Sequence, residues 1–339
     1  MTRRRKSEPL FDTVALIGVG LIGSSLARLM RREGLARRIV GCARPRRTRS
    51  VCRELKLVDA TSASPRQAAK GADLIVICTP VSTYGAIAAA IAPSLKPGAI
   101  VSDVGSVKRT AIDAVTPHLL DGVHFVPGHP VAGTEHSGPE AGFAELFEGR
   151  WCILTPTEGT DAAAVRQVTD LWRRAGSRVE IMDAAHHDLV LAVTSHLPHL
   201  IAYNIVGTAA DLESVTDSEV FKYSAGGFRD FTRIAASDPV MWRDVFLHNR
   251  DALLEVLGRF NEDLSALQRA IRRGQGEVLE ALFVRTRDIR RGVIEAGQAE
   301  ALLAGGPETE TATRHPKKKR RARGGKPAGI RRRTSGPGR

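Results

Sequence analysis

The chain has 339 residues and a formal net charge of +13, a length that allows two domains with separate cores. Its charge lies at the ends: residues 1–10 hold four basic side chains and one acid, and residues 302–339 hold twelve and two. The remaining 34 basic and 34 acidic side chains cancel. The body is therefore neutral. We expect residues 299–339, which carry almost no large apolar side chains, to form a disordered basic tail.

Composition disfavours several classes of protein. No run approaches the length of a membrane span, and the basic extension, residues 1–10, does not lead into a secretory signal. The cysteines lack paired metal spacing, so we expect neither disulfides nor a metal site. We therefore expect a cytoplasmic protein without a membrane partner. The tail could make weak, salt-sensitive contact with nucleic acid, although a solvated appendage is the simpler interpretation.

A glycine-rich turn follows the first predicted strand. The apolar run 13–17 ends in the segment 18–23, Gly-Val-Gly-Leu-Ile-Gly, and residues 24–30 then show helical apolar spacing. Gly18 allows a tight turn, Gly20 lets a pyrophosphate approach the backbone, and Gly23 lets the helix pack against the strand. The phosphates would meet the free N–H groups of that helix. Strand, glycines and helix in this order predict a dinucleotide site.

The cofactor is NAD or NADP. The second strand, 38–43, is followed by Arg44 where an NAD site places an acid for the ribose 2′-OH. A guanidinium suits a 2′-phosphate, so the pattern favours NADP slightly, but an arginine can also stack on adenine. The candidate cofactor-binding residues are Gly18, Gly20, Leu21, Ile22, Gly23, Arg44, Thr79, Pro80 and Ser106.

Strand-like and helical runs alternate up to Asp183. Apolar runs at 73–78, 99–104, 124–126, 151–154 and 178–182 are separated by helical stretches such as 83–91 and 162–174. This alternation predicts an α/β fold: an N-terminal Rossmann-type doubly wound sheet over residues 11–183. Residues 184–298 read as helices at 186–206, 238–257 and 262–297, the last broken at 274–276. We expect an all-α substrate and dimerisation domain.

The segment 128–138 holds a histidine between a glycine and a proline. We expect His129 to lie in a rigid turn at the carboxyl end of the strand 124–126, where α/β folds place their chemistry. Polar residues that a core would not need also gather at 102–108, 194–199 and 226–244. His136, His186 and His187 look like surface or capping residues, His196 like a helix-packing residue, and Arg229 and Arg243 like salt-bridged surface residues.

With these segments the chain resembles the prephenate/arogenate (cyclohexadienyl) dehydrogenases over roughly residues 12–298. The resemblance implies NAD(P)-dependent oxidative decarboxylation of a cyclohexadienyl acid in tyrosine biosynthesis by a homodimer. It implies His129 as the catalytic base, Ser106 as its partner and His199 as a histidine near nicotinamide and substrate. It further implies that the substrate-binding residues are Thr134, Glu135, Arg233, which holds the ring carboxylate, Asp230 nearby, and Trp242, which reaches across the dimer.

Other interpretations stay open at this point. Ser106 could instead bond the cofactor, and Trp242 could simply fill the core. A β-hydroxyacid-type dehydrogenase would use a lysine on a second-domain helix, which 186–206 lacks. A nucleotide-sensing regulator with a nucleic-acid-binding tail would show a degraded site. Prephenate cannot be told from arogenate, because the residues that meet the side chain are not identified.

Overall fold

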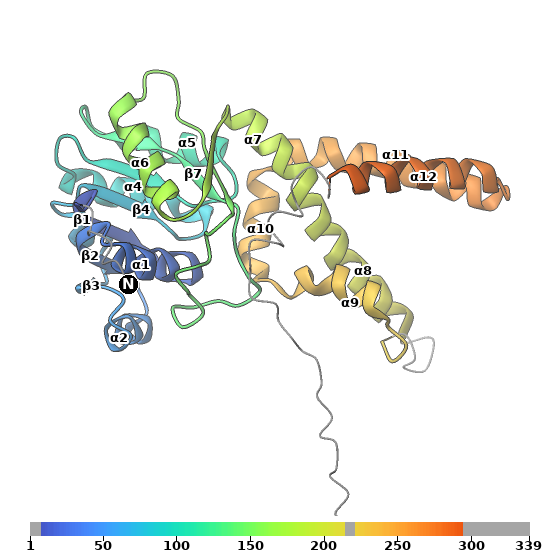
Figure 1. The fold of residues 1–339 in the computed structure, drawn as a ribbon, viewed down its shortest axis with the longest axis horizontal. Helices are drawn as coiled ribbons and strands as arrows, with labels where there is room; N and C mark the ends of the chain where they lie inside the picture. Colours follow the sequence, from blue (N-terminus) through green and yellow to red (C-terminus); the bar gives the residue numbers. More distant parts are fainter. Residues whose placement is uncertain (1–7, 214–220, 294–339) are drawn as a thin grey trace, which may run out of the picture. The chain divides into compact units, whose positions relative to one another are not determined.

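The computed structural model describes residues 8–213 and 221–293 (Figure 1). The chain divides into one unit that spans residues 1–289 and a second that begins at residue 290. The expected basic tail, 299–339, and most of the N-terminal extension lie outside the described residues.

Six parallel strands form the main sheet in the order β3-β2-β1-β4-β5-β6. Their bounds are β1 (Phe11–Ile17), β2 (Ala36–Cys42), β3 (Ala60–Ser62), β4 (Leu74–Ile77), β5 (Ile100–Asp103) and β6 (His124–Val126). All four residues of the central strand β4 are buried, as expected for a parallel strand covered on both faces. The strand order reverses between β1 and β4, and in such sheets the ligand crevice opens at that point.

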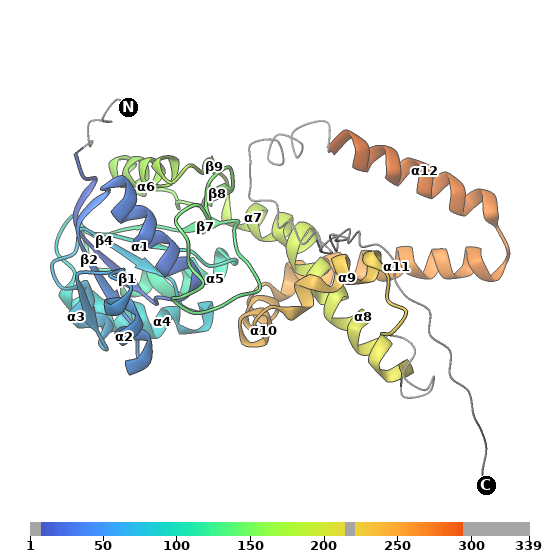
Figure 2. The same cartoon turned by 60° about the horizontal axis from the view of Figure 1, so that its bottom comes forward.

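Helices cover both faces of this sheet (Figures 1 and 2). The helices of this half are α1 (Leu21–Glu33), α2 (Arg46–Glu54), α3 (Pro65–Ala69), α4 (Tyr84–Ile91), α5 (Arg109–Val115) and α6 (Ala162–Arg174). Alternate residues of β1 enter two different cores: Leu16 packs with residues of α1 and α6, whereas Ile17 packs with residues of α3, α4 and α5. This alternation follows from the two-residue period of a strand. The doubly wound architecture expected from the sequence is confirmed.

The last strands of this half do not extend the main sheet. The strands β7 (Gly128–Pro130), β8 (Trp151–Leu154) and β9 (Arg178–Ile181) form a separate three-stranded sheet, with β7 antiparallel to β8 and β8 parallel to β9. The expectation of one sheet that continues to Asp183 is therefore wrong. An apolar run reveals a strand but not its pairing partner, because pairing depends on residues far apart in the chain.

His129 lies on β7, so the expected turn at this position is wrong as well. Gly128 does not adopt a left-handed conformation; a Cβ there would instead lie 3.1 Å from the Asp103 carbonyl oxygen and 3.2 Å from Leu154 Cδ2. The glycine therefore eases the close approach of β5 to β7, where a side chain would push its neighbours apart by a few tenths of an ångström.

The residues after Asp183 are helical in the described part of the chain. They form α7 (Ala184–Leu191), a π-helical turn (Ala192–His196), α8 (Leu197–Glu213), α9 (Gly226–Thr232), α10 (Pro239–His248), α11 (Arg250–Arg272) and α12 (Gly276–Val293). The expected break at 274–276 is confirmed: Gly274 has φ +63°, which ends α11. The expected helix 238–257 is two helices, separated at Asn249.

One continuous helical stretch, Ala184–Leu212, is long and apolar enough to cross a membrane by length and composition. The expectation that no run approaches that length is therefore wrong. Length alone does not make a membrane span, since core helices of other proteins meet the same criterion. This stretch carries three buried polar side chains, His187, Asp188 and His196, which contact other protein groups.

Candidate active site

The glycines of the first βα turn leave room for a phosphate group. Gly18 has φ +101°, and a Cβ there would lie 2.7 Å from the Cys78 carbonyl oxygen. A Cβ on Gly23 would lie 2.2 Å from the Gly18 carbonyl oxygen, whereas one on Gly20 would meet nothing within 4 Å. Gly20 precedes α1, whose N-terminus has no side-chain cap. The open N–H groups of this helix therefore fit an anionic pyrophosphate.

The other candidate cofactor residues lie at the carboxyl ends of neighbouring strands. Leu21 and Ile22, the first residues of α1, pack against the core under it. Thr79 and Pro80 follow β4, Ser106 follows β5, and exposed Arg44 lies just beyond β2. The carboxyl ends of parallel strands lie at one edge of the sheet, so these residues lie at the same edge as Gly20 and the uncapped N-terminus of α1.

A fully buried ion pair holds the strand that carries the catalytic candidate. Lys108 Nζ donates to Asp103 Oδ2 (2.5 Å) and to the Gly128 carbonyl (2.6 Å), and the Gly128 N–H donates to Asp103 Oδ1 (3.1 Å). Both side chains have 0% exposure. A buried charge is tolerated when it is paired and hydrogen-bonded, as here. The pair fixes β7, and with it His129, against the end of β5.

His129 is the first member of a chain of three side chains. Its Nδ1 lies 2.9 Å from His187 Nε2, and His187 Nδ1 lies 2.8 Å from Asp188 Oδ1. The Asp188 carboxylate also accepts the backbone N–H groups of Lys108 (2.7 Å) and Arg109 (3.0 Å). The expectation that His187 is a surface or capping residue is wrong, since its side chain is 0% exposed. His136 and His186 are exposed.

The hydrogen bonds that link Asp188, His187 and His129 determine which ring nitrogen of each imidazole carries the hydrogen. The Asp188 oxygens are acceptors, so His187 Nδ1 must carry a hydrogen and His187 Nε2 must accept. His129 Nδ1 therefore donates to His187, and the lone pair of His129 is left on Nε2. Burial is the main reason that the pKa of His129 lies well below its ordinary value, and the nearby His187 and Lys108 lower it further. A neutral imidazole with one free lone pair is a base.

Ser106 is half-buried in the loop after β5. In the described part of the chain the side chain of His129 is hydrogen-bonded to His187, and the implied role of Ser106 as its partner stays a prediction. Sequence reasoning missed His187, Asp188 and the Asp103–Lys108 pair. A usable signal was present: a His-Asp dipeptide within an otherwise apolar helix has to find polar partners.

His199 and Trp242 form a stacked pair, with ring centroids 3.6 Å apart and an interplanar angle of 21°. His199 Nδ1 lies 2.8 Å from the Ser195 carbonyl, which is part of the π-helical turn. Burial lowers the pKa of His199. Trp242 is 7% exposed and packs within its own chain against Val107 and Val245. Its expected reach across a dimer stays a prediction.

The candidate substrate-binding residues are partly brought together. Arg233 Nη1 lies 3.3 Å from Glu135 Oε2, and the arginine side chain is 62% exposed. Thr134, next to Glu135, accepts the N–H of His136, and Asp230 is exposed on α9. Arg243 is an exposed residue paired with Asp244, as expected. The Arg233 guanidinium therefore stands open beside one acid and can bind a carboxylate.

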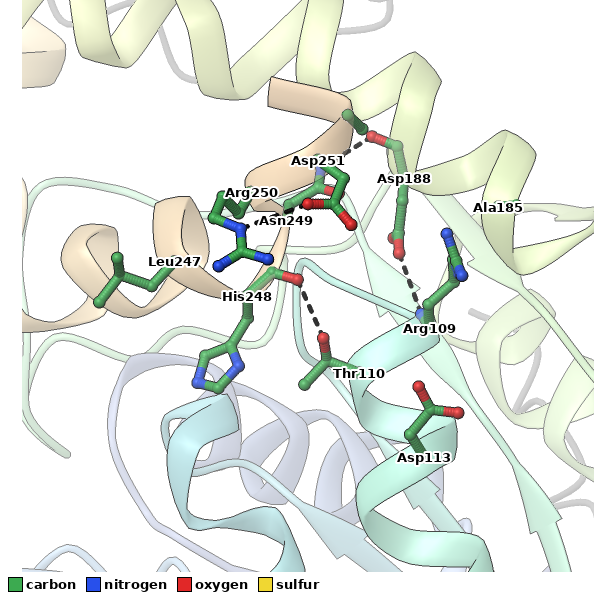
Figure 3. A pocket seen from close by; sticks show the side chains of 11 residues that line it. Arg109, Thr110, Asp113, Ala185, Asp188, Leu247, His248, Asn249, Arg250 and Asp251 are labelled. Carbon is green, nitrogen blue, oxygen red and sulfur yellow. Dashed lines mark hydrogen bonds and ion pairs between the residues drawn. The ribbon is translucent and has the colours of Figure 1, made fainter. Parts of the chain in front are cut away.

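A polar hollow lies along the contact between the strand-containing half and the helices (Figure 3). Its floor is tied by hydrogen bonds: Thr110 donates to the His248 carbonyl (2.9 Å), and Asn249 Nδ2 donates to the Asp188 carbonyl (2.8 Å). Asn249 Nδ2 also lies 2.9 Å from His196 Nδ1, so the buried His196 is a packing residue as expected. These bonds hold Asp188 in place behind the two histidines.

The cysteines are free and the described residues include no metal-binding cluster. Cys42, Cys52 and Cys152 are buried, and burial raises the pKa of the Cys42 thiol to about 11. Among residues 8–213 and 221–293, no group of three or more His, Cys, Asp or Glu side chains is placed to hold a metal ion.

Comparison with known proteins identifies relatives of this chain. Residues 26–181 match the family model described as prephenate dehydrogenase, nucleotide-binding domain, and residues 183–285 match prephenate dehydrogenase, dimerization domain. The chain is 42% identical over 281 residues to the cyclohexadienyl dehydrogenase of Zymomonas mobilis, which covers 83% of this chain and 96% of the relative.

Two solved structures are similar along nearly their whole length. Prephenate dehydrogenase from Aquifex aeolicus in complex with hydroxyphenyl propionate and NAD⁺ is 36% identical, with a TM-score of 0.77, over 84% of this chain and 98% of that one. Synechocystis arogenate dehydrogenase is 28% identical, with a TM-score of 0.70, over 83% and 99%.

Proposed function

This chain belongs to the prephenate dehydrogenase family, and we propose that it oxidatively decarboxylates prephenate, arogenate or both with NAD(P)⁺ in tyrosine biosynthesis. The assignment of roles rests on one observation, the hydrogen-bonded series of side chains Asp188–His187–His129. It presents one neutral, unprotonated imidazole nitrogen beside the edge of the sheet where the dinucleotide turn opens.

His129 acts as the general base. When bound, NAD(P)⁺ accepts the hydride that leaves C4 of the ring. His129 Nε2 takes the proton of the C4 hydroxyl, which becomes a carbonyl, while the hydrogen bonds through His187 to Asp188 hold the His129 ring in the orientation and tautomer that accept the proton. Loss of CO₂ then aromatises the ring, and the proton returns to the phenolate oxygen. General-base assistance of this kind typically contributes about 10²–10⁴-fold.

Arg233 holds the ring carboxylate through a bidentate pair, which sets the register of the ring against the nicotinamide. Without substrate, the Glu135 carboxylate pairs with the Arg233 guanidinium. When substrate binds, its ring carboxylate replaces Glu135 in that pair. Thr134 and Asp230 line the same entrance. His199, stacked on Trp242, faces the nicotinamide side, and Ser106 contacts the cofactor or the C4 hydroxyl.

The finer properties are also proposals. Arg44, exposed beyond β2 with no acid in its place, favours NADP over NAD. A homodimer is supported by the matched dimerization domain and by exposed apolar side chains on α8 and α11, namely Ile205, Leu254, Leu264 and Ile271. We place the enzyme in the cytoplasm, where its cofactor is available.

Absorbance at 340 nm tests the function directly. Protein is mixed with prephenate or arogenate and with NAD⁺ or NADP⁺ in all four combinations. At least one combination should produce reduced cofactor, and the His129→Asn variant should lower that rate by about 10²–10⁴-fold while still binding cofactor. No turnover in any combination would reject the function, and near-normal turnover in the variant would reject His129 as base.

A further inference from the structure

A hydrogen bond ties the loop after β4 to a helix of the second half of the chain. The hydroxyl of Ser82, in the 3₁₀ turn Val81–Thr83, donates to Asp244 Oδ2 on α10. The two residues are 162 positions apart in the sequence. Ser82 comes two residues after Pro80, and Asp244 comes two residues after Trp242. The bond therefore joins the loop that carries the candidate cofactor residues Thr79 and Pro80 to the helix that carries the indole stacked on His199.

Asp244 places a charged side chain in a buried contact between α10 and the loop after β4. It is only 4% exposed, and a buried carboxylate is costly unless its oxygens are hydrogen-bonded. Burial opposes its ionisation, but hydrogen bonds from Ser82 and from Arg243, whose Nη2 lies 2.7 Å from Oδ1, hold the pKa of Asp244 below its ordinary value. An apolar side chain would dock α10 at less cost, so the charged contact specifies one arrangement of α10 on the loop.

Helix α10 packs against the 3₁₀ turn Val81–Thr83 and also contacts residues that follow β5. Val107 packs against Trp242 and Val245, and Thr110 donates to the His248 carbonyl. Helix α10 therefore contacts the ends of two strands. An apolar contact and a hydrogen bond to a backbone carbonyl of α10 join it to the β5 side. The Ser82–Asp244 bond joins it to the β4 side.

We propose that Ser82 and Asp244 form a latch that couples cofactor binding to substrate binding. This inference rests on the proposed function, in which Thr79 and Pro80 contact the cofactor. Cofactor that packs against these residues fixes the loop, the loop fixes α10 through Ser82, and α10 fixes the Trp242–His199 pair against the substrate. Ser82 and Asp244 are positioning residues. By thermodynamic linkage, substrate must strengthen cofactor binding by the same factor by which cofactor strengthens substrate binding.

The test is a thermodynamic cycle with a ligand that cannot react. Dissociation constants of 4-hydroxyphenylpropionate are measured by calorimetry with and without saturating NAD(P)⁺, in the full-length protein. Wild type should bind it about 5- to 150-fold more tightly with cofactor, the usual size of such coupling. Ser82→Ala should reduce this factor to below about twofold, while the affinity of the cofactor-free protein stays unchanged. Ser82→Thr, which keeps the hydroxyl, should retain the coupling.

Ser94→Ala is the matched control, because Ser94 also donates from a 3₁₀ turn, to the Ile91 carbonyl at 2.7 Å, but lies away from α10. Its coupling factor should equal that of wild type. An unchanged factor in Ser82→Ala, or no coupling in wild type, overturns the latch while both ligands still bind. A wild-type protein that binds neither ligand overturns the proposed function itself.

Discussion

His129 Nδ1 lies 2.9 Å from His187 Nε2, with both imidazoles buried and their rings nearly perpendicular at 69°. This contact assigns different tasks to two histidines that look alike in the sequence. His187, bonded on its other side to Asp188, can only accept, and so leaves His129 with its lone pair directed away from the protein partner. His187 acts through His129 and is a positioning residue.

Replacing His187 tests this arrangement. In His187→Phe, His129 loses the acceptor that selects its tautomer, and we expect kcat to fall by about 10- to 100-fold while cofactor affinity stays within about twofold. His187 also helps to lower the pKa of His129. The acidic limb of the pH profile of kcat/KM should therefore move to higher pH. His187→Gln, which keeps an acceptor oxygen, should recover part of kcat; exposed His186→Gln should resemble wild type. An unmoved acidic limb in His187→Phe would show a purely structural role.

Much of the fold could be predicted because local signals agree with the tertiary structure. The four buried residues of β4 read as a continuous apolar run, and α6 begins directly after Asp161, whose side chain accepts the N–H of Ala164. Gly274 ends α11 where a glycine pair marked a break. These features depend on residues within one or two turns of each other, so a sequence displays them directly.

The second sheet and the chain of histidines could not be predicted for the same reason. The partner of His129 on β8 is Ile153, 24 positions away, and its hydrogen-bond partner His187 is 58 positions away. Asp188 indicates that polar partners are needed, but the sequence does not show which of the adjacent residues His186 and His187 is buried. The stacking of Trp242 on His199 depends on how α8 and α10 pack together, which no local pattern encodes.

Arg233→Ala tests the binding of the ring carboxylate. Among the described residues the guanidinium pairs with Glu135, so its loss should raise the KM for prephenate more than it lowers kcat. Removing one partner of a desolvated charged pair costs about 2–5 kcal/mol, but the Arg233 side chain is 62% exposed and solvent screens it, so we expect a loss at the low end of that range, roughly 30-fold in affinity. Arg229→Ala, on α9 just before the 3₁₀ turn that Arg233 begins, is the control and should keep KM. Steady-state kinetics decide: a KM within twofold of wild type in Arg233→Ala would place the carboxylate elsewhere.

The pH dependence of stability tests the buried histidines. Burial lowers the pKa of His196 to about 4, whereas an unfolded histidine titrates near about 6.5. Between these values the unfolded chain binds a proton that the folded chain does not, so the free energy of unfolding should fall as pH drops from about 6.5 to about 4. One such group contributes up to about 3 kcal/mol over that window.

Urea denaturation at pH 7, 6 and 5 measures this slope. His196→Gln should be less stable at pH 7, because the contact with Asn249 changes, but its free energy of unfolding should decline less steeply toward pH 5. His129 and His187 titrate in the same direction and remain in the variant, so some slope persists. Exposed His186→Gln should keep the slope of wild type. Parallel slopes in His196→Gln and wild type would show that His196 is not buried as a neutral group.

Cofactor choice tests the role of Arg44. If its guanidinium meets the 2′-phosphate, kcat/KM should favour NADP⁺ at low salt, and the preference should shrink as salt rises, because exposed charges are screened over about 8–10 Å at ordinary ionic strength. Arg44→Asp should shift the preference toward NAD⁺, since a carboxylate accepts the ribose hydroxyl and repels the phosphate. Arg166→Asp, exposed on α6, which packs against β6 and β9 and not against the end of β2, controls for the change in net charge. A wild-type preference for NAD⁺ without salt dependence would mean that Arg44 only lines the adenine site.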